Sequence, residues 1–410
     1  MEEESRGLVM LAGIRVSLFL ALRALRRGNL GSLLLTVVIV GMVFTNMIFM
    51  PSIITGAIKN YEQQTIETYT SDIIIQPKED AEFIEDLQAL LDKVNRVPGV
   101  WRASPHYAAG AVLRFRGNAL PMGVIGVIPR DERLVTTVHS HMIAGNYLGD
   151  GDTGEIVIGK YVAGERDVSD VFLPSLGGVR VGDTISAAYT NGVVREYRVK
   201  GIFQTYSFNT DAMAFTTWEE MELVAGESLD QASVVLVKTS PGSDENAVKK
   251  SLLRYGVQEK VQTWLEFLGT AYTDAVESYA ILNSITTVVS LVIAAVVLFV
   301  VIMIKTLNSR RQIGILLAIG IRRDIIINSY LFQVLILASL GIVFGILVVL
   351  GLTAYFTAYP IEFPEGSVAP YLVPAEIGTN ALYLFFTSAL AGFIPAWRIA
   401  RKDILESMRA

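Results

Sequence analysis

Residues 325–361 read IIINSYLFQVLILASLGIVFGILVVLGLTAYFTAYPI, without a single Asp, Glu, Lys, Arg or His. A charged side chain at the centre of a bilayer costs about 2.5–3.5 kcal/mol on insertion scales, and about 20 apolar residues cross its hydrocarbon core. Three further stretches are equally free of charge, at residues 28–58, 278–304 and 377–397. The sequence therefore predicts four transmembrane helices.

Basic residues gather on one side of these four helices. They are Arg6, Arg15, Arg23, Arg26 and Arg27, then Lys305, Arg310, Arg311, Arg322 and Arg323, and finally Arg398, Arg401, Lys402 and Arg409. The loop between the third and fourth helices has none and carries Glu362, Glu365 and Glu376. Because basic short loops stay in the cytoplasm, we expect cytoplasmic termini, a cytoplasmic second loop and an extracytoplasmic insert at residues 59–277.

Composition limits the class of protein. Hydrophobic residues make up 52% of the chain and charged residues 18%, as in an integral membrane protein with a water-soluble domain. The insert holds 20 Lys and Arg against 31 Asp and Glu, so it is acidic, and this charge argues against nucleic acid as a partner. There is no cysteine, which excludes disulfides and thiol redox chemistry. The start, Met1-Glu2-Glu3-Glu4, is unlike a cleavable signal peptide, which begins with basic residues.

Residues 8–27 predict an amphipathic helix before the first span. Its apolar residues recur every three or four positions, and they are Leu11, Ile14, Leu18, Leu22 and Leu25. A basic amphipathic helix suits a membrane surface, where it either serves only as an anchor or forms an elbow that contacts a partner. Residues 59–70 and 264–279 are helix-compatible, so the first two spans are expected to continue outward as stalks.

The insert shows strand, helix and strand twice. The first set is residues 72–76, 79–97 and 111–116, the last followed by a strand at 122–128 across Gly117-Asn118, and the second set is 233–238, 244–255 and 257–264. Between the sets, residues 184–189 and 193–203 predict a hairpin across Asn191-Gly192, a dipeptide that fits a type I′ turn. We expect an α/β subdomain at 59–130 and 231–277, split by a β-rich insertion at 131–230.

The predicted fold is thus an α-helical membrane protein with four transmembrane helices and a large α/β extracytoplasmic domain between helices 1 and 2. Its parts are residues 1–58 with the amphipathic helix and helix 1, residues 59–277 with the extracytoplasmic domain, and residues 278–410 with helices 2–4. Gly341 and Gly345 form a small-x-x-x-small pair that is either a helix contact face or an ordinary feature of a membrane helix.

Few residues could carry chemistry. His139 and His141 would share a face on a strand, but two histidines without a third ligand are typical of a surface, and His106 stands alone. The spans lack the buried Asp, Glu, Lys or His of an ion relay, which argues against a secondary transporter or an intramembrane protease. No Gly-x-x-x-x-Gly-Lys-Ser/Thr loop is present to hold a nucleotide. We therefore expect no catalytic residue and no metal site.

Residues 308–323, NSRRQIGILLAIGIRR, lie in the basic loop between the second and third spans. A short helix ended by Gly320 would present Ile313, Leu316 and Leu317 on one side and arginines on another. Apolar anchors beside arginine are typical of a partner groove, whereas a basic turn could also merely anchor the loop to lipid headgroups. Spacing alone does not separate these interpretations.

Three segments resemble the FtsX-like permease family of ABC transporters, in particular its MacB-type and lipoprotein-releasing members. They are LALRALRR with GSLL at 20–34, the block at 308–323, and PAWRIAR with ILESMR at 395–409. Residues 197–203, YRVKGIF, also look like the lipoprotein-releasing branch. The chain departs from the family at Gln312, where Glu is usual, and at Leu317, where Lys is frequent, so its pairing with an ATPase could differ.

The resemblance implies a permease in the plasma (inner) membrane that works with a separate ABC ATPase dimer, which would bind ATP and Mg, and with a second permease copy or a related subunit. The ATPase-coupling residues that it implies are Arg310, Arg311, Gln312, Ile313, Gly314, Leu316, Leu317, Gly320, Arg322 and Arg323, with Arg23, Arg26 and Arg27 in the elbow helix. Motion of the ATPase would then reach the outer domain and release a lipoprotein or export a substrate.

Two alternatives remain at this point. A signalling member of the same family would regulate a cell-wall enzyme or sense a peptide through its outer domain. An unrelated four-span protein would serve adhesion or structure, and it would not co-purify with an ATPase.

Overall fold

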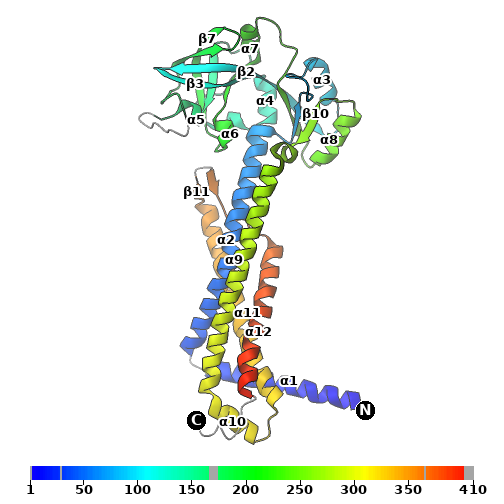
Figure 1. Cartoon of the computed structure of the whole chain (residues 1–410), viewed down its shortest axis with the longest axis vertical. Coiled ribbons are helices and arrows are strands. Elements are labelled where there is room, and N and C mark those ends of the chain that lie inside the picture. Colours follow the sequence, from blue (N-terminus) through cyan, green and yellow to red (C-terminus); the bar gives the residue numbers. More distant parts are fainter. Residues whose placement is uncertain (1, 28–29, 166–173, 364–365, 401–410) are drawn as a thin grey trace. The chain divides into compact units, whose positions relative to one another are not determined.

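The computed structural model describes residues 2–27, 30–165, 174–363 and 366–400 (Figure 1). The chain divides into two compact units. The helix unit comprises Met1–Ala57, Val276–Ile361 and Val368–Ala410, and the sheet unit comprises Ile58–Ala275 and Glu362–Ser367.

Four helices in the described segments are long and apolar enough to cross a membrane, which confirms the four predicted spans. They are α2 (Leu30–Thr65), α9 (Trp264–Asn308), α11 (Arg323–Ala358) and α12 (Pro374–Ala400). In the helix unit they share a core that includes Phe44, Leu298, Val334 and Leu384, each fully buried. Their other faces carry exposed aliphatic side chains, as expected of helices that lie against lipid.

The α2 and α11 helices touch through glycines. A Cβ atom added at Gly345 would lie 2.7 Å from the carbonyl oxygen of Gly41, and one added at Gly341 would lie 2.9 Å from the Cβ of Val40. The Thr45 hydroxyl donates a hydrogen bond of 3.4 Å to the Gly345 carbonyl. The small-x-x-x-small pair is therefore a helix contact face, because any larger side chain would separate the two backbones.

Two shorter helices, α1 (Glu2–Arg27) and α10 (Arg310–Ala318), lie at the same end of the helix unit (Figure 1). The structure confirms a helix before the first span, but this helix packs through a face other than the predicted apolar stripe. Ser17 and Ala21 are fully buried, and the Ser17 hydroxyl donates a 3.0 Å hydrogen bond to the Ile325 carbonyl of α11. Leu18 and Leu22 are exposed instead, because small residues allow a closer approach to α11 and leave the large ones for the membrane surface.

The sheet unit is built on a ten-stranded sheet in the order β10-β1-β9-β2-β3-β8-β5-β7-β4, with β6 paired to both β2 and β7. Its strands are β1 (Ile73–Gln76), β2 (Val100–Phe115), β3 (Asn118–Val127), β4 (Met142–Gly145), β5 (Glu155–Gly159), β6 (Thr184–Tyr189), β7 (Val194–Phe203), β8 (Ala214–Thr217), β9 (Val234–Thr239) and β10 (Lys260–Thr263). Through β6 the six strands β2, β3, β8, β5, β7 and β6 close into a barrel, which leaves them no free edge.

Helices accompany these strands in the order that the sequence predicts for the two repeats, β1-α3-β2 and β9-α8-β10. The helices are α3 (Leu87–Val94), α4 (Pro129–Val135), α5 (Lys160–Ala163), α6 (Phe208–Asp211), α7 (Trp218–Ala225) and α8 (Glu245–Arg254), with a π-helix at Ile66–Thr70 and a 3-10 helix at Val138–Ser140. A small two-stranded sheet pairs β11 (Ile361–Phe363) with β12 (Gly366–Val368).

The barrel shares strands with the α/β part. The β2 strand begins at Val100, well before the predicted residue 111, and pairs first with β9 and then with β6. The two parts of the sheet unit are therefore joined through β2 and β3, and residue 130 does not separate them.

Two local predictions were wrong for identifiable reasons. Helix α3 begins at Leu87 rather than residue 79, because Ile84 forms a β-bridge with Ala232 through hydrogen bonds of 2.8 and 3.0 Å. The β6–β7 hairpin is present, but of its turn residues only Gly192 has positive φ, at 87°, so the turn is type I with a glycine bulge. The consecutive positive φ values of a type I′ turn occur at Arg116 and Gly117.

Within the sheet unit, the segment that ends α2 and the segment that begins α9 lie side by side. The Tyr61 and Tyr272 rings stack with centroids 5.9 Å apart, and the Tyr272 hydroxyl donates a 2.7 Å hydrogen bond to Glu62. Both predicted stalk segments are helical, although α9 is kinked at Gly269, where φ is 69°.

Candidate functional site

The α10 helix has a well-defined end. Gly320, with φ of 92°, donates its N–H to the Leu317 carbonyl over 3.1 Å, and Ile321 donates to the Leu316 carbonyl over 3.1 Å. These two bonds form the Schellman motif, which needs a left-handed residue and therefore favours glycine. The predicted stop at Gly320 is confirmed.

One face of α10 packs against the chain itself. Ile313 is only 4% exposed and lies in a cluster with Ile326 and Tyr330 of α11 and Ala396 of α12. Leu316 and Leu317 are partly buried against the same cluster, and Gly314 is buried. Ile313 is therefore buried within the chain instead of facing outward, because an apolar stripe beside membrane helices packs against them, whereas Leu316 and Leu317 stay partly exposed.

The opposite face of α10 is exposed and partly apolar. Ile315 is 50% exposed and Ile319, one turn later, is 70% exposed, while Gln312 precedes Ile315 by three residues and is exposed too. Positions three and four apart share one face of a helix. The sequence contained this signal, because Ile315 and Ile319 at i and i+4 form a second apolar stripe. The stripe of Ile313, Leu316 and Leu317 is larger and is therefore the one that the sequence pattern indicates first.

The basic residues around this face are placed as follows. Arg322 and Arg323 are exposed, and Arg322 pairs with Asp324 over 2.9 Å. On α1, Arg23 and Arg26 are exposed, and the Arg23 guanidinium lies 5.9 Å from the centre of the Phe19 ring. The side chains of Arg27, Arg310 and Arg311 lie outside the described part of the structure, as do Arg401, Lys402 and Arg409.

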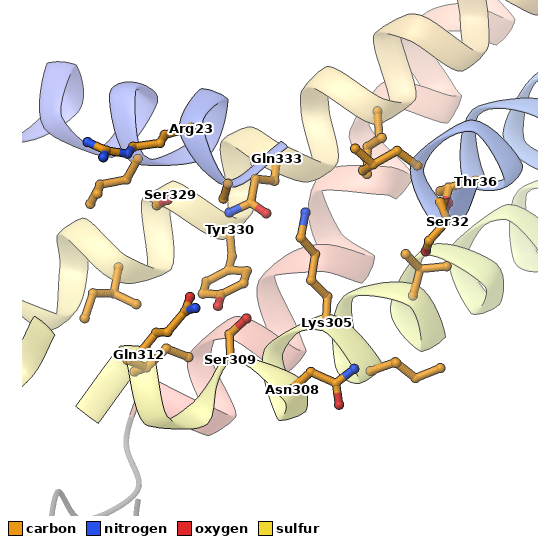
Figure 2. A pocket seen from close by; sticks show the side chains of 18 of the residues that line it. Arg23, Ser32, Thr36, Lys305, Asn308, Ser309, Gln312, Ser329, Tyr330 and Gln333 are labelled. Atoms are coloured by element: carbon orange, nitrogen blue, oxygen red, sulfur yellow. The ribbon is translucent and has the colours of Figure 1, made fainter. Parts of the chain in front are cut away.

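A cavity of about 680 Å³ opens where α1, α2, α9, α10 and α11 meet (Figure 2). Its polar lining residues are Arg23, Ser32, Thr36, Lys305, Asn308, Ser309, Gln312, Ser329, Tyr330 and Gln333. The predicted coupling segment and the predicted elbow helix thus both border one cavity, through Gln312 and Ile313 on one side and Arg23 on the other.

Lys305 is the most unusual residue of this cavity. It was expected among the basic residues of the loop, but it lies in the last turn of α9 with its Nζ atom buried and without a hydrogen-bond partner among the described residues. Gln333, which is 2% exposed, also has an unpaired buried Oε1 atom. Lys305 therefore follows the predicted span at residues 278–304 directly, but it belongs to α9 and its ammonium group is buried.

In the sheet unit, the histidine that seemed isolated has a partner. His106 Nε2 lies 2.8 Å from a carboxylate oxygen of Glu132, which also accepts hydrogen bonds from Ser104 over 2.7 Å and from Thr136 over 2.8 Å. Burial alone would raise the pKa of Glu132, but the charge of His106 and the hydrogen bonds from His106, Ser104 and Thr136 outweigh it and lower the pKa. This cluster connects β2 to α4.

His139 and His141 are not on a strand. His139 lies in the 3-10 helix at Val138–Ser140 with its ring 6.3 Å from the Tyr147 ring, whereas His141 Nδ1 lies 2.8 Å from the Thr137 carbonyl oxygen. Within the described residues, no group of three His, Asp or Glu side chains could hold a metal ion.

The segment 197–203 builds the barrel. Lys200 pairs with Asp152 and with Glu155, the latter over 2.8 Å, and the Tyr197 hydroxyl lies 2.7 Å from that of Tyr189. These charge partners raise the pKa of Lys200 although its partial burial opposes them. A Cβ atom at Gly201 would lie 2.5 Å from the Asn146 carbonyl oxygen, so only glycine fits there. The segment therefore has a structural role.

Two family models match the chain. Residues 33–255 match the MacB-like periplasmic core domain, and residues 284–404 match the FtsX-like permease C-terminal region.

Curated relatives agree with these matches. The chain is 22% identical over 340 residues to the macrolide export ATP-binding/permease protein MacB 2 of Aeromonas hydrophila, an alignment that covers 79% of the chain and 48% of the relative. It is 24% identical over 181 residues to MacB of Hahella chejuensis, which covers 43% of the chain and 27% of the relative. The chain spans less than half the length of these two relatives.

A solved structure is also similar. The periplasmic region of MacB from Actinobacillus actinomycetemcomitans aligns with a TM-score of 0.38 and 11% identity over 52% of this chain and 97% of that one. The match to the periplasmic core domain covers more than half of the 410 residues, and a second match covers the membrane helices at the other end of the sequence. The chain belongs to the FtsX-like permease family of ABC transporters and carries a MacB-like periplasmic core domain.

Proposed function

We propose that this chain is a permease that transmits ATP-driven motion from an ABC ATPase dimer to its periplasmic core domain. The moving domain would release a lipoprotein or export a substrate from the outer face of the inner membrane. Relatives named for macrolide export add macrolides to the proposed substrate class. ATP and Mg would be bound by the ATPase, and two permease copies, or this chain with a related subunit, would meet one ATPase dimer.

The observation that carries the proposal is the two-sided packing of α10. Its buried face is fixed to α11 and α12 through Ile313, Ile326 and Ala396. On its other face Ile315 and, at the C-cap, Ile319 are exposed, so a partner could bind there. A push on the exposed face would therefore move the membrane helices, because the buried face leaves α10 no freedom to slide over them.

The length of α2 and α9 supports the same proposal. A bilayer core needs about 20 helical residues, whereas these helices have 36 and 45 residues. Each begins or ends within the sheet unit, where Tyr61 and Tyr272 stack. The α9 helix is kinked at Gly269, but it continues from there to Asn308, and an uninterrupted helix transmits a tilt because its backbone hydrogen bonds resist local bending.

The proposed topology follows from charge. The end of the helix unit that carries α1 and α10 also carries Arg23, Arg26, Arg322 and Arg323, all exposed. This end would face the cytoplasm and the ATPase. The core domain would then lie on the opposite side of the membrane, and the word periplasmic in its family description supports this placement.

A flexible insertion tests transmission directly. Four glycines inserted after Ala275, where the sheet unit ends within α9, should interrupt the helix and leave the α10 surface intact. We expect ATP hydrolysis by the purified complex to stay within about twofold of the parent, while substrate release falls at least tenfold. Hydrolysis and release of a lipoprotein from proteoliposomes would be measured in the same preparation.

The matched control is the same insertion after Asp150, in an exposed turn of the sheet unit. It should leave both activities unchanged. Full substrate release after the insertion in α9 would contradict mechanical transmission. Loss of ATP hydrolysis both with and without the lipoprotein substrate would instead indicate that α9 signals to the ATPase.

A further inference from the structure

The cavity between α1, α2, α9, α10 and α11 contains a cation that no described residue neutralises. Lys305 Nζ is buried, and no acceptor among the described residues lies within hydrogen-bonding distance. None of the cavity's lining residues, all of which belong to the described segments, is acidic. An isolated buried ammonium is costly, so its position beside an open cavity points to an anionic ligand.

Polar groups surround this cation. Gln333 also points into the cavity with an unpaired Oε1 atom and is 98% buried, and Tyr330, Ser309 and Gln312 add hydroxyl and amide groups (Figure 2). The Lys305 ammonium, the hydroxyls of Tyr330 and Ser309 and the amide N–H groups of Gln312 and Gln333 can donate to the oxygens of a phosphate group. The unpaired Oε1 atom of Gln333 is an acceptor, and it needs a donor from the ligand. The volume of about 680 Å³ is in the range of sites for small ligands.

An apolar groove continues from the cavity along α2 and α11. It has a volume of about 420 Å³, and it shares Leu33 and Leu337 with the polar cavity. The rest of its lining is leucine, valine and Phe344 from α1, α2 and α11. The polar cavity with Lys305 and the adjoining apolar groove together match an amphiphile that has a phosphate head group and acyl chains.

We propose that this composite site binds an anionic phospholipid of the inner leaflet, with its phosphate at Lys305 and Gln333 and an acyl chain in the groove. The bound lipid would join the elbow helix α1 to α10 and to the ends of α9 and α11, because the cavity is lined by all of these elements. The lipid composition of the membrane would then tune how firmly the coupling helix is held.

A soluble phosphate compound would use the same cation, but it would leave the groove empty. An acidic side chain of a protein partner would also pair with Lys305, but it would not need the ten apolar residues that line the groove. The continuity of the two compartments therefore favours a lipid.

The test compares the purified full-length chain in detergent with added phosphatidylglycerol, phosphatidylcholine or glycerol 3-phosphate. We expect phosphatidylglycerol to raise the melting temperature by several degrees and to be retained in native mass spectrometry at least tenfold better by the parent than by Lys305→Gln. Gln333→Glu should lose the same retention, since its carboxylate would neutralise Lys305 from within. Arg398→Gln is the matched control, because it removes an exposed positive charge from the last turn of α12, outside the cavity lining. This variant should retain the lipid.

Melting temperatures without lipid separate binding from a structural role. Lys305→Gln removes the unpaired buried cation and Gln333→Glu gives it a counter-charge, so the melting temperature of both variants without lipid should equal that of the parent or exceed it. A lower melting temperature with unchanged lipid retention would overturn the proposal and assign Lys305 to the fold.

Three other results would also overturn it. An equal shift with glycerol 3-phosphate would identify a soluble phosphate ligand, and equal loss in Arg398→Gln would identify a general charge effect. Unchanged lipid retention in Lys305→Gln together with loss of ATPase binding would identify an acidic group of the partner as the occupant.

Discussion

Replacement of both Ile315 and Ile319 by aspartate is expected to abolish stimulation of the ATPase while the permease still folds and inserts. Both side chains are exposed on one face of α10, so their loss removes no internal contact. Apolar anchors at the centre of an interface contribute about 2 kcal/mol or more each, and 1.4 kcal/mol is tenfold in affinity. ATP hydrolysis by the reconstituted complex should therefore fall to the level of the ATPase alone.

Ile313→Asp is the informative contrast. Ile313 is 4% exposed against α11 and α12, so a charge there should reduce the amount of folded permease rather than its stimulation of the ATPase. Val194→Asp, an exposed substitution in β7, controls for added negative charge. If Ile315→Asp with Ile319→Asp leaves stimulation intact while the protein is folded, α10 is not the contact.

Glu132→Ala is expected to cost the sheet unit about 3–5 kcal/mol, because it leaves His106 buried without its carboxylate partner. Two hydroxyl groups, those of Ser104 and Thr136, would lose their acceptor as well. For a unit of this size the melting temperature of the full chain should fall by about 10 °C. Glu85→Ala, an exposed carboxylate of the same unit, should change it by little.

Acid should act on the same cluster. The folded-state pKa of Glu132 lies below its ordinary value of 4.5, so the stabilisation is complete above pH 4.5 and is lost as the pH falls through the folded-state pKa. Thermal unfolding between pH 6 and pH 3 should thus show a steeper loss of stability in the parent chain than in Glu132→Gln. Identical slopes would contradict the ionised state of Glu132 in the folded protein.

The membrane helices could be predicted from the sequence because exclusion of charge is a strong and local signal. The same holds for β5, β6, α8 and the cap at Gly320, since the signal for each lies in neighbouring residues of the sequence. The predicted start of helix α3 was wrong because Ile84 pairs with Ala232, a residue that is distant in sequence. Closure of the barrel through β6 could not be read from the sequence for the same reason.

The coupling role of residues 308–323 stays a prediction, and the structure changes which face of this segment is exposed. Ile313, Leu316 and Leu317 have the spacing of an interface stripe, and only tertiary packing shows that α11 and α12 cover it. The charge of Lys305 predicts a position in a solvent-exposed loop. In the structure α9 continues to Asn308, and Lys305 lines a cavity instead. Periodicity identifies a stripe, but it does not name the surface that the stripe meets.

Site-directed cross-linking tests the central claim most directly, and the absence of native cysteine makes every introduced thiol unique. The Ile315→Cys variant, treated with a short thiol-reactive photo-cross-linker, should form a covalent adduct with the ATPase in native membranes. The Ile313→Cys variant, whose thiol would be buried against α11, should form none. An adduct of equal yield at both positions, or reaction of Ile315→Cys with a membrane-impermeant reagent outside intact cells, would contradict the account.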